Sequence, residues 1–549
     1  MREVWRGMKT ITGFRPTNSR GAEGGENRAN ELNLFFNRFD TTVSAQTPTT
    51  PPVVSLEPRA TPLCQPLSSH STVASCEIPD TPPPPITFTQ YQVEIQMRRL
   101  HSGKSAGPDG VSPRVLKVCA PQLCGVFHKL FMLSLSLQRV PVMWKTSCLV
   151  PIPKTPRPSG PQDYRPVALT SHIMKTLERL ILDQLRPIVR PHLDPLQFAY
   201  QPRLGTEDAI IYLLNRVYTH LDQPASTVRV MFFDFSSAFN TIRPTLLGDK
   251  LAAMQVDASL VSWIVDYLTG RPQYVRLPQC VSDKVISNTG APQGTVLSPF
   301  LFTLYTTDFS HCIETCHLQK FSDDSAVVGC ISRDDETEYR SVVDSFVTWC
   351  EQNHLQLNVA KTKELIVDFR KTRKHLTPVS IQGVSVDIVE DYKYLGVYID
   401  NKLNWTKNTT ALYRKGQSRL YFLRRLRSFN ICQKMLRIFY ESVVASAILY
   451  AVAYWGSRLR VADANRLDKL IRKASNVVGM ELDSLKVVSE RRMLSKIKTM
   501  LDNTSHPLHD MLVSHRSAFS ERLRVPKSTT ERHRKSFLPV AISLYNAST

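Results

Sequence analysis

The alternation of apolar and polar positions changes near residue 90. Pro, Thr and Ser dominate from Thr41 to Pro85, and such a composition cannot bury enough apolar surface to fold. We therefore expect residues 1–90 to form a disordered segment, in which only Leu32 to Phe39 is apolar enough to dock elsewhere. From Tyr91 onward, apolar positions recur at helical or strand spacing, which indicates a folded region.

Two apolar segments end in acidic residues. Thr227 to Phe235 is a nearly continuous apolar run that carries Asp234 at its end, a pattern typical of a buried strand. About 90 residues later, apolar runs flank the sequence Ser-Asp-Asp-Ser at positions 322–325, which predicts a tight β-hairpin. Each feature also has an ordinary explanation, because Asp often caps helices and often occupies turns.

The remaining pattern alternates helices with short strands. Predicted helices cover 113–138, a stretch through Trp263 and Leu268, 300–309 and 339–350, and predicted strands cover 148–154, 163–169 and 392–399. The loop between residues 288 and 299 contains Gly290 and Gly294, which allow backbone to approach a ligand closely. The sequence thus predicts an α+β fold, and a chain of 549 residues is expected to contain two to four domains.

The chain is basic, with a formal net charge of +21. Between Asn401 and Thr549 there are 28 Lys and Arg against 10 Asp and Glu, so a charge of +18 lies in the last part of the chain. This concentration favours a polyanionic partner, nucleic acid in particular. A basic surface that is merely solvated is the alternative.

Other features limit the class of protein. No signal peptide is visible, and the longest uncharged apolar run, Ser442 to Ser457, is shorter than the ~20 residues that span a bilayer. A buried helix explains that run, so we expect no membrane partner. The 11 cysteines are scattered without zinc-site spacing, which predicts reduced thiols in an intracellular protein. The segment Ser102 to Gly110 resembles a phosphate loop but lacks the Walker spacing.

The acidic residues become informative together. In a split β-α-β sheet, adjacent middle strands can bring Asp234 close to Asp323 and Asp324. Such carboxylates can hold two metal ions ~4 Å apart, an arrangement that supports in-line phosphoryl transfer.

This order of motifs resembles the reverse transcriptases of non-LTR, LINE-like retrotransposons. The matching blocks, in chain order, are Lys104–Gly110, Val150–Lys154, Asp163–Pro166, Gln197–Ala209, Asp234–Phe239, Ala291–Thr295, Phe321–Asp324, Leu357–Thr362 and Tyr394–Gly396. The resemblance extends from about Tyr91 to at least Trp455. It implies a right-hand polymerase with fingers and an antiparallel palm sheet at 91–400, a helical basic thumb at 401–480 and a basic C-terminal tail at 481–549.

The resemblance also implies the catalytic roles. Asp234 and Asp323 are expected to bind two Mg²⁺ ions, which Mn²⁺ can replace, and Asp324 stands beside them. Lys361 occupies the position of a proton donor to the leaving pyrophosphate.

The implied substrates are dNTPs, a DNA primer and an RNA template. Gln293 and Gly294 are expected to contact the incoming nucleotide, and Lys154 and Arg165 its triphosphate. Phe239 is expected to stack under the sugar and exclude a 2′-hydroxyl. The strand segment Tyr394, Leu395 and Gly396 is expected to seat the primer end.

The chain departs from the family pattern in a few places. Asn240 stands where many relatives have a second aspartate, and Ser322 replaces an alanine. The first 90 residues cannot hold the family's endonuclease, and no cysteine follows Cys432 to form a Cys/His knuckle. We therefore expect the polymerase core of a copy truncated upstream. A catalytically idle nucleic-acid-binding remnant is the alternative, and the bulky Phe239 disfavours an RNA-directed RNA polymerase.

Overall fold

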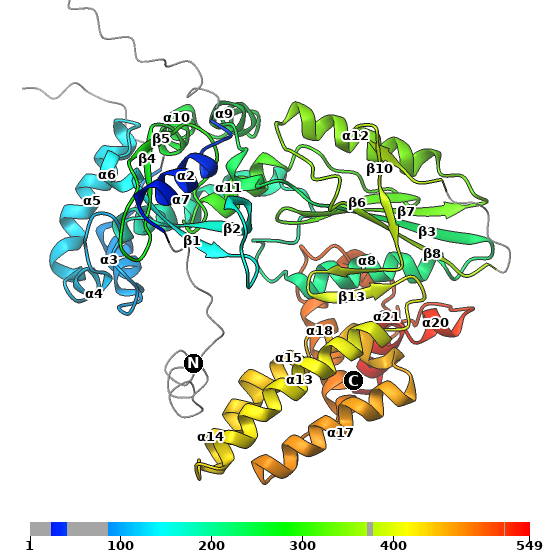
Figure 1. Ribbon diagram of the computed structural model, residues 1–549. Helices are drawn as coiled ribbons and strands as arrows, with labels where there is room; N and C mark the ends of the chain where they lie inside the picture. Colours follow the sequence, from blue (N-terminus) through cyan, green and yellow to red (C-terminus); the bar gives the residue numbers. More distant parts are fainter. Residues whose placement is uncertain (1–23, 41–85, 371–376, 521, 549) are drawn as a thin grey trace, which may run out of the picture. The chain divides into compact units, whose positions relative to one another are not determined.

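The computed structural model describes residues 24–40, 86–370, 377–520 and 522–548 (Figure 1). They divide into two units, and the described chain passes from one unit to the other three times, after Val189, Arg243 and Leu297. One unit is built from Arg190–Arg243 and Ser298–Thr549, and the other from Gly21–Val189 and Pro244–Leu297. Each unit has its own sheet, so the predicted α+β class is confirmed.

A five-stranded sheet organises the first unit, in the order β11 (Asp387–Val389), β8 (Lys363–Asp368), β3 (Ser226–Phe233), β7 (Asp324–Ser332) and β6 (Cys316–Phe321). All neighbours are antiparallel except β11 and β8, which run parallel. Helix α12 (Thr337–Gln352) covers one face and α8 (Thr206–His220) the other (Figure 1). Every residue of β3 is buried, which explains its continuous apolar run.

A buried ion pair fastens α12 to the sheet. Arg229 of β3 is 0% exposed and donates two hydrogen bonds of 2.8 Å to Glu364 of β8, which is also 0% exposed. The hydroxyl of Tyr339 on α12 donates to the same carboxylate at 2.6 Å. Buried charges are tolerated only when paired and hydrogen-bonded in this way.

Replacing one partner of this pair is expected to destabilise the protein strongly. Glu364→Ala leaves the Arg229 guanidinium buried without its main carboxylate, which costs ~3–5 kcal/mol of unfolding free energy in a urea titration. The double replacement Arg229→Met with Glu364→Leu should recover most of that free energy, because no charge then remains to be buried. As a control, Arg437→Ala removes an exposed ion pair with Glu441 and should change the midpoint little. Equal destabilisation of the single and double variants would contradict this explanation.

Long helices follow the sheet and share its core. Helices α13 (Thr406–Arg427), α17 (Val461–Val478), α18 (Leu485–Leu501) and α21 (Phe537–Ser548) contribute buried residues to the same cluster as α8 and the inner sheet face. The predicted basic tail at 481–549 is therefore wrong for the described residues, which are folded.

Two carboxylates bind this C-terminal region, Asp208 on α8 and Asp222 just after the end of that helix. Asp208 accepts hydrogen bonds from Lys496 at 3.0 Å and His506 at 3.1 Å. Asp222 accepts from the backbone N–H groups of Thr529 at 2.8 Å and Thr530 at 2.7 Å. These long-range bonds join the C-terminal helices to the rest of the same unit.

The second unit contains a smaller sheet in the order β2 (Tyr164–Leu169), β1 (Ser147–Pro153), β4 (Arg271–Val275) and β5 (Val285–Ser287). Helix α2 (Glu26–Phe36) packs on this sheet through Ala29, Leu32 and Phe36. The prediction that residues 1–90 are disordered is therefore wrong for α2, whereas the predicted docking of its apolar stretch is confirmed. Residues 1–23 and 41–85 lie outside the described residues.

The other helices and strands include helices in the predicted regions 113–138, around Trp263 and Leu268, and 300–309. They are α3 (Gln90–Arg98), α4 (Pro113–Val118), α5 (Ala120–Ser136), α6 (Val142–Lys145), α7 (His172–Val189), α9 (Pro244–Ala253), α10 (Ala258–Leu268), α11 (Ser298–Tyr305), α14 (Gln433–Phe439), α15 (Ser446–Ile448), α16 (Val452–Trp455), α19 (His509–Ser514), α20 (Glu531–Arg534), β9 (Ser380–Ile381) and β10 (Val384–Ser385). The single strand predicted at 392–399 is wrong, because β12 (Asp391–Tyr394) and β13 (Val397–Asp400) form a hairpin there.

The apolar run at 442–457 is mostly buried, as expected. Among the described residues, no single helix is long and apolar enough to cross a membrane. One bent pair, Gln433–Ile448 and Val452–Arg458 at 51°, meets the requirement by length and composition. The cysteines that the structure describes are free thiols.

Candidate active site

The register of the five-stranded sheet brings the aspartates together. Phe233 of β3 pairs with Ser325 of β7, so the next antiparallel step sets Asp234 opposite Asp324. Side chains directly opposite in antiparallel strands have Cβ atoms about 4.5–5.5 Å apart. Asp323 lies in the adjoining turn between β6 and β7, because Phe321 pairs with Asp324. The predicted hairpin is confirmed. Its turn consists of Ser322 and Asp323 and is shorter than the predicted polar tip at positions 322–325.

The three carboxylates influence one another electrostatically. Desolvation by the surrounding protein, together with the charges of Asp323 and Asp234, raises the pKa of Asp324 to about 6. The ring of Tyr392 stacks on Phe232, with centroids 4.1 Å apart. Burial, with the charges of Asp324 and Asp234, raises the pKa of Tyr392 to about 12. The end of the sheet is therefore a site of concentrated negative charge.

Lys361 reaches this site from the segment that follows α12. Its Nζ lies 3.7 Å from Oδ2 of Asp234. The backbone of this segment is fixed to the strand end, because the N–H of Asn358 donates to the carbonyl of Asp234 at 2.8 Å. The N–H of Asp234 in turn donates to the Thr362 hydroxyl at 3.4 Å. The structure thus brings the predicted proton donor beside a predicted metal ligand.

The donor set fits a divalent cation. In the described residues, no group of three or more His, Cys, Asp or Glu side chains is already placed so as to hold an ion. The strand register sets Asp234 opposite Asp324, with Asp323 in the adjoining turn, and the charges of Asp323 and Asp234 contribute to the raised pKa of Asp324. A divalent cation there would offset their mutual repulsion, and carboxylate oxygens are the ligands that Mg²⁺ prefers.

Phe239 follows Asp234 on a short 3₁₀ turn, Ala238–Asn240. Its half-buried ring stacks on Phe302 of α11 with the centroids 4.8 Å apart and the planes at 23°. This contact fixes one face of the ring. It suits both a core aromatic and a rigid wall under a sugar, so both interpretations of Phe239 stand.

The predicted primer-binding residues form the turn of the β12–β13 hairpin. The buried hydroxyl of Tyr394 accepts a hydrogen bond of 2.9 Å from Gln319 of β6. At the turn, the Leu395 carbonyl accepts from the Tyr450 hydroxyl at 2.9 Å, and Gly396 has φ +90°. The ring of Tyr394 lies 5.2 Å from that of Phe232. The hairpin therefore lies beside the strand that ends in Asp234.

The predicted triphosphate-binding residues lie in the other unit, on the β1–β2 hairpin. Arg165 pairs with Ile152, so its side chain shares a face with that residue. Lys154 continues the same alternation two positions on, and its backbone N–H donates to the Asp163 carbonyl at 2.7 Å. Both cationic side chains are exposed, and together they form a basic face on this hairpin.

The loop that carries Gln293 and Gly294 is fastened to the same sheet. The carbonyl of Gln293 accepts from the N–H of Ala168 on β2 at 2.7 Å. Gly294 has φ +118°, and a Cβ there would lie 2.7 Å from the Ala168 carbonyl oxygen. No other residue suits this close approach.

Sequence reasoning missed Glu178 of α7 as a support for this loop. Its fully buried carboxylate accepts from the N–H groups of Val296 at 2.5 Å and Leu297 at 2.9 Å. Burial raises the pKa of Glu178 above its ordinary value. The sequence signal is a single acidic residue among the apolar positions of α7.

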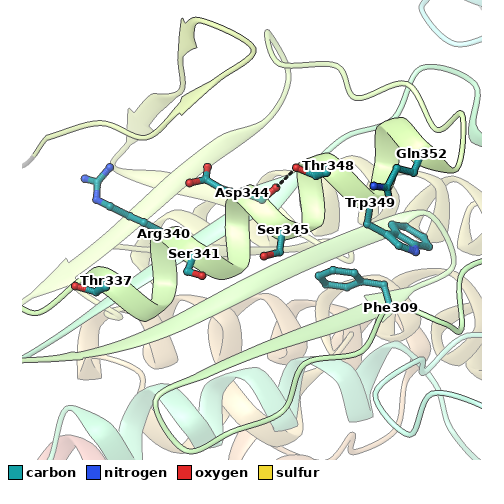
Figure 2. A pocket seen from close by; sticks show the side chains of 9 residues that line it. All are labelled: Phe309, Thr337, Arg340, Ser341, Asp344, Ser345, Thr348, Trp349 and Gln352. Atoms are coloured by element: carbon teal, nitrogen blue, oxygen red, sulfur yellow. Dashed lines mark hydrogen bonds between the residues drawn. The ribbon is translucent and has the colours of Figure 1, made fainter.

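A separate surface groove of about 850 Å³ runs along α12. Figure 2 shows its lining by Phe309, Trp349 and polar side chains of the helix. Phe233 contacts Phe346 of α12, so the neighbouring Asp234 is directed to the other face of the sheet. The groove contains none of the predicted site residues.

Comparison with known proteins shows what this part of the chain resembles. Residues 152–399 match the family model described as reverse transcriptase (RNA-dependent DNA polymerase). All the predicted site residues, from Lys154 to Gly396, fall inside the matched residues. A second model, the N-terminal region of alkylated DNA repair protein alkB homolog 8, matches residues 405–446.

Relatives along most of the chain come from non-LTR retrotransposons, as predicted. The chain is 25% identical over 472 residues to the probable RNA-directed DNA polymerase from transposon BS of Drosophila melanogaster, covering 83% of this chain and 51% of that protein. It is 26% identical over 497 residues to the RNA-directed DNA polymerase from mobile element jockey of Drosophila funebris, covering 83% and 52%. The chain therefore spans about half the length of these relatives.

Solved structures of telomerase from Candida tropicalis are also similar. The apo form is 11% identical with a TM-score of 0.36, over 68% of each chain. The complex with a fragment of telomeric RNA is 12% identical with a TM-score of 0.35, over 68% of this chain and 64% of that one.

Proposed function

We propose that this chain is an RNA-directed DNA polymerase with the right-hand arrangement of fingers, palm and thumb. The observation that carries the proposal is the placement of Asp234 opposite Asp324, with Asp323 in the adjoining turn, inside a reverse transcriptase domain. The five-stranded sheet is the palm, the basic helices from α13 onward supply the thumb, and the β1–β2 hairpin belongs to the fingers. An RNA template, a DNA primer and dNTPs are the substrates.

Each side chain has a defined task in this reaction. Asp234 and Asp323, supported by Asp324, would hold two Mg²⁺ ions, which lower the pKa of the primer 3′-hydroxyl and neutralise charge on the phosphates. The primer 3′-hydroxyl loses its proton to solvent, its oxygen forms a bond to the α-phosphorus of the dNTP, and the bond to pyrophosphate breaks. Lys361 gives its Nζ proton to the departing pyrophosphate.

The remaining residues position the nucleotide and the primer. Lys154 and Arg165 bind the triphosphate through their exposed cationic groups, and the loop at Gly294 lets backbone approach the nucleotide. The turn at Leu395 and Gly396 supports the primer end. Correct positioning contributes much of the rate in such reactions.

Primer extension on an RNA template tests the proposal. The full chain, an RNA template, an annealed DNA primer and all four dNTPs should give extended products in Mg²⁺ and none after chelation with EDTA. A protein that binds the template and primer tightly but never extends the primer would be the idle remnant instead.

Nucleic-acid affinity should depend on exposed cations of the thumb. Since Ser457 to Thr549 contains core helices, deleting it would unfold the unit, and point substitutions are the cleaner test. Arg424, Arg425 and Arg427 are exposed at the end of α13. Replacing all three by Gln should flatten the slope of log affinity against log salt by ~0.7 to 0.9 for each phosphate that the protein no longer binds.

The matched control removes three cations that already have carboxylate partners. Arg437, Arg491 and Lys535 pair with Glu441, Asp483 and Glu531, respectively. Replacing them by Gln changes the net charge equally, and the slope should stay near that of the unmodified protein. Equal slopes for both triple variants would show that the thumb charge is only a solvated surface.

A further inference from the structure

The turn that carries Asp323 has an unusual backbone. Ser322 is buried and has φ +60°, in the left-handed region that non-glycine residues rarely occupy. Such a strained conformation persists only where the surroundings impose it. The contacts of Ser322 therefore decide where the neighbouring carboxylate lies.

The segment before α8 lies alongside the edge strand β6. The N–H of Lys320 donates to the Leu196 carbonyl, and the N–H of Phe198 donates to the Lys320 carbonyl, both at 2.9 Å. These bonds make residues 196–198 a short parallel partner of β6. Only Phe321 separates the last of these bonds, at Lys320, from the hairpin turn at Ser322 and Asp323.

The side chain of Gln197 continues this pairing into the turn. It is 1% exposed, and its Oε1 accepts from the N–H of Ser322 at 2.9 Å and from that of Ala199 at 3.1 Å. Its Nε2 donates to the Ser322 carbonyl at 3.4 Å. One amide thus satisfies both backbone polar groups of Ser322, which an apolar side chain of the same size cannot do.

Tyr200 adds a contact that depends on Ser322 being a serine. The Tyr200 hydroxyl lies 3.1 Å from the Ser322 hydroxyl oxygen. An alanine at position 322 would lack this bond while keeping the strain of the left-handed backbone.

We propose that Gln197 and Tyr200 are positioning residues that hold the Ser322 turn so that Asp323 can bind a divalent cation. Neither side chain needs to touch the ion, because both act through Ser322. This inference rests on the proposed function, in which Asp323 is a metal ligand. It also gives the segment Gln197 to Tyr200 a task in the catalytic site.

Mn²⁺ binding by the full chain, followed by electron paramagnetic resonance without nucleic acid, tests the inference directly. Gln197→Met removes the acceptor but keeps the volume, and should weaken Mn²⁺ binding about tenfold, because a buried N–H is left unsatisfied. Tyr200→Phe and Ser322→Ala should each weaken it about two- to threefold. Combining these two substitutions should weaken it no further than either alone, because both remove the same bond.

A structural control separates positioning from general destabilisation. Ser489→Ala removes a buried hydrogen bond to the Val452 carbonyl in the same unit, away from the aspartates. It should lower the thermal midpoint and leave Mn²⁺ affinity unchanged. Unchanged Mn²⁺ affinity in Gln197→Met would overturn the inference. If the unmodified protein binds Mn²⁺ but extends no primer, the proposed polymerase function fails, and the Mn²⁺ titrations still decide the role of Gln197.

Discussion

Asp323→Asn is expected to abolish dNTP incorporation while leaving RNA binding nearly intact. Asp323 lies in the turn between β6 and β7, next to the carboxylate of Asp324 that faces Asp234. An amide cannot supply the negative charge that holds a divalent cation at the reacting phosphate. The rate of primer extension should therefore fall by about a thousandfold or more, because the transition-state charge is no longer stabilised.

Binding of the RNA template depends on other groups. In the proposed function, the cations that contact phosphates lie on the thumb helices, so the dissociation constant for RNA should change less than about twofold. Asp335→Asn is a matched control, since Asp335 is an exposed aspartate whose carboxylate accepts from the Thr337 N–H at the start of α12. It changes the charge equally and should leave extension at the unmodified rate. An Asp323→Asn protein that extends a primer normally would refute the metal-ligand assignment.

Phe239→Val is expected to raise the use of rNTPs relative to dNTPs by about tenfold or more, because discrimination by a steric clash disappears with the ring. The stacking of Phe239 on Phe302 holds the ring in place, as a rigid wall under the sugar requires. Shortening the side chain leaves space for a 2′-hydroxyl. The measurement is kcat/KM for a dNTP and the matching rNTP on one RNA template.

A role for Phe239 in core packing alone predicts a different result. Removal of a buried ring then costs ~2–4 kcal/mol of stability, and both substrates are affected in proportion. Phe309→Val provides the comparison, because Phe309 is also half-buried and contacts Phe346 with the centroids 5.2 Å apart. It should lower stability without changing the ratio of substrates. An unchanged ratio in Phe239→Val would exclude the steric gate.

Much of the catalytic unit was predictable because its signals are local. The continuous apolar run before Asp234 identifies β3, since a strand covered on both faces has no polar positions. The apolar runs around Asp323 and Asp324 likewise identify the β6–β7 hairpin. In both segments, the neighbouring apolar residues show which positions are buried, so the sequence alone located the acidic residues.

Only the tertiary structure decided which distant residues support them. Gln197 and Glu178 are polar residues within otherwise apolar stretches, and nothing nearby in sequence shows that they bind the Ser322 turn and the loop after Gly294. The helices at 481–548 read as a basic tail because their cations are frequent, yet their buried apolar residues belong to the same core cluster as those of α8. A buried polar group or an amphipathic face requires a partner. Which residue becomes that partner depends on how distant segments of the chain come together, and no local pattern of residues specifies this.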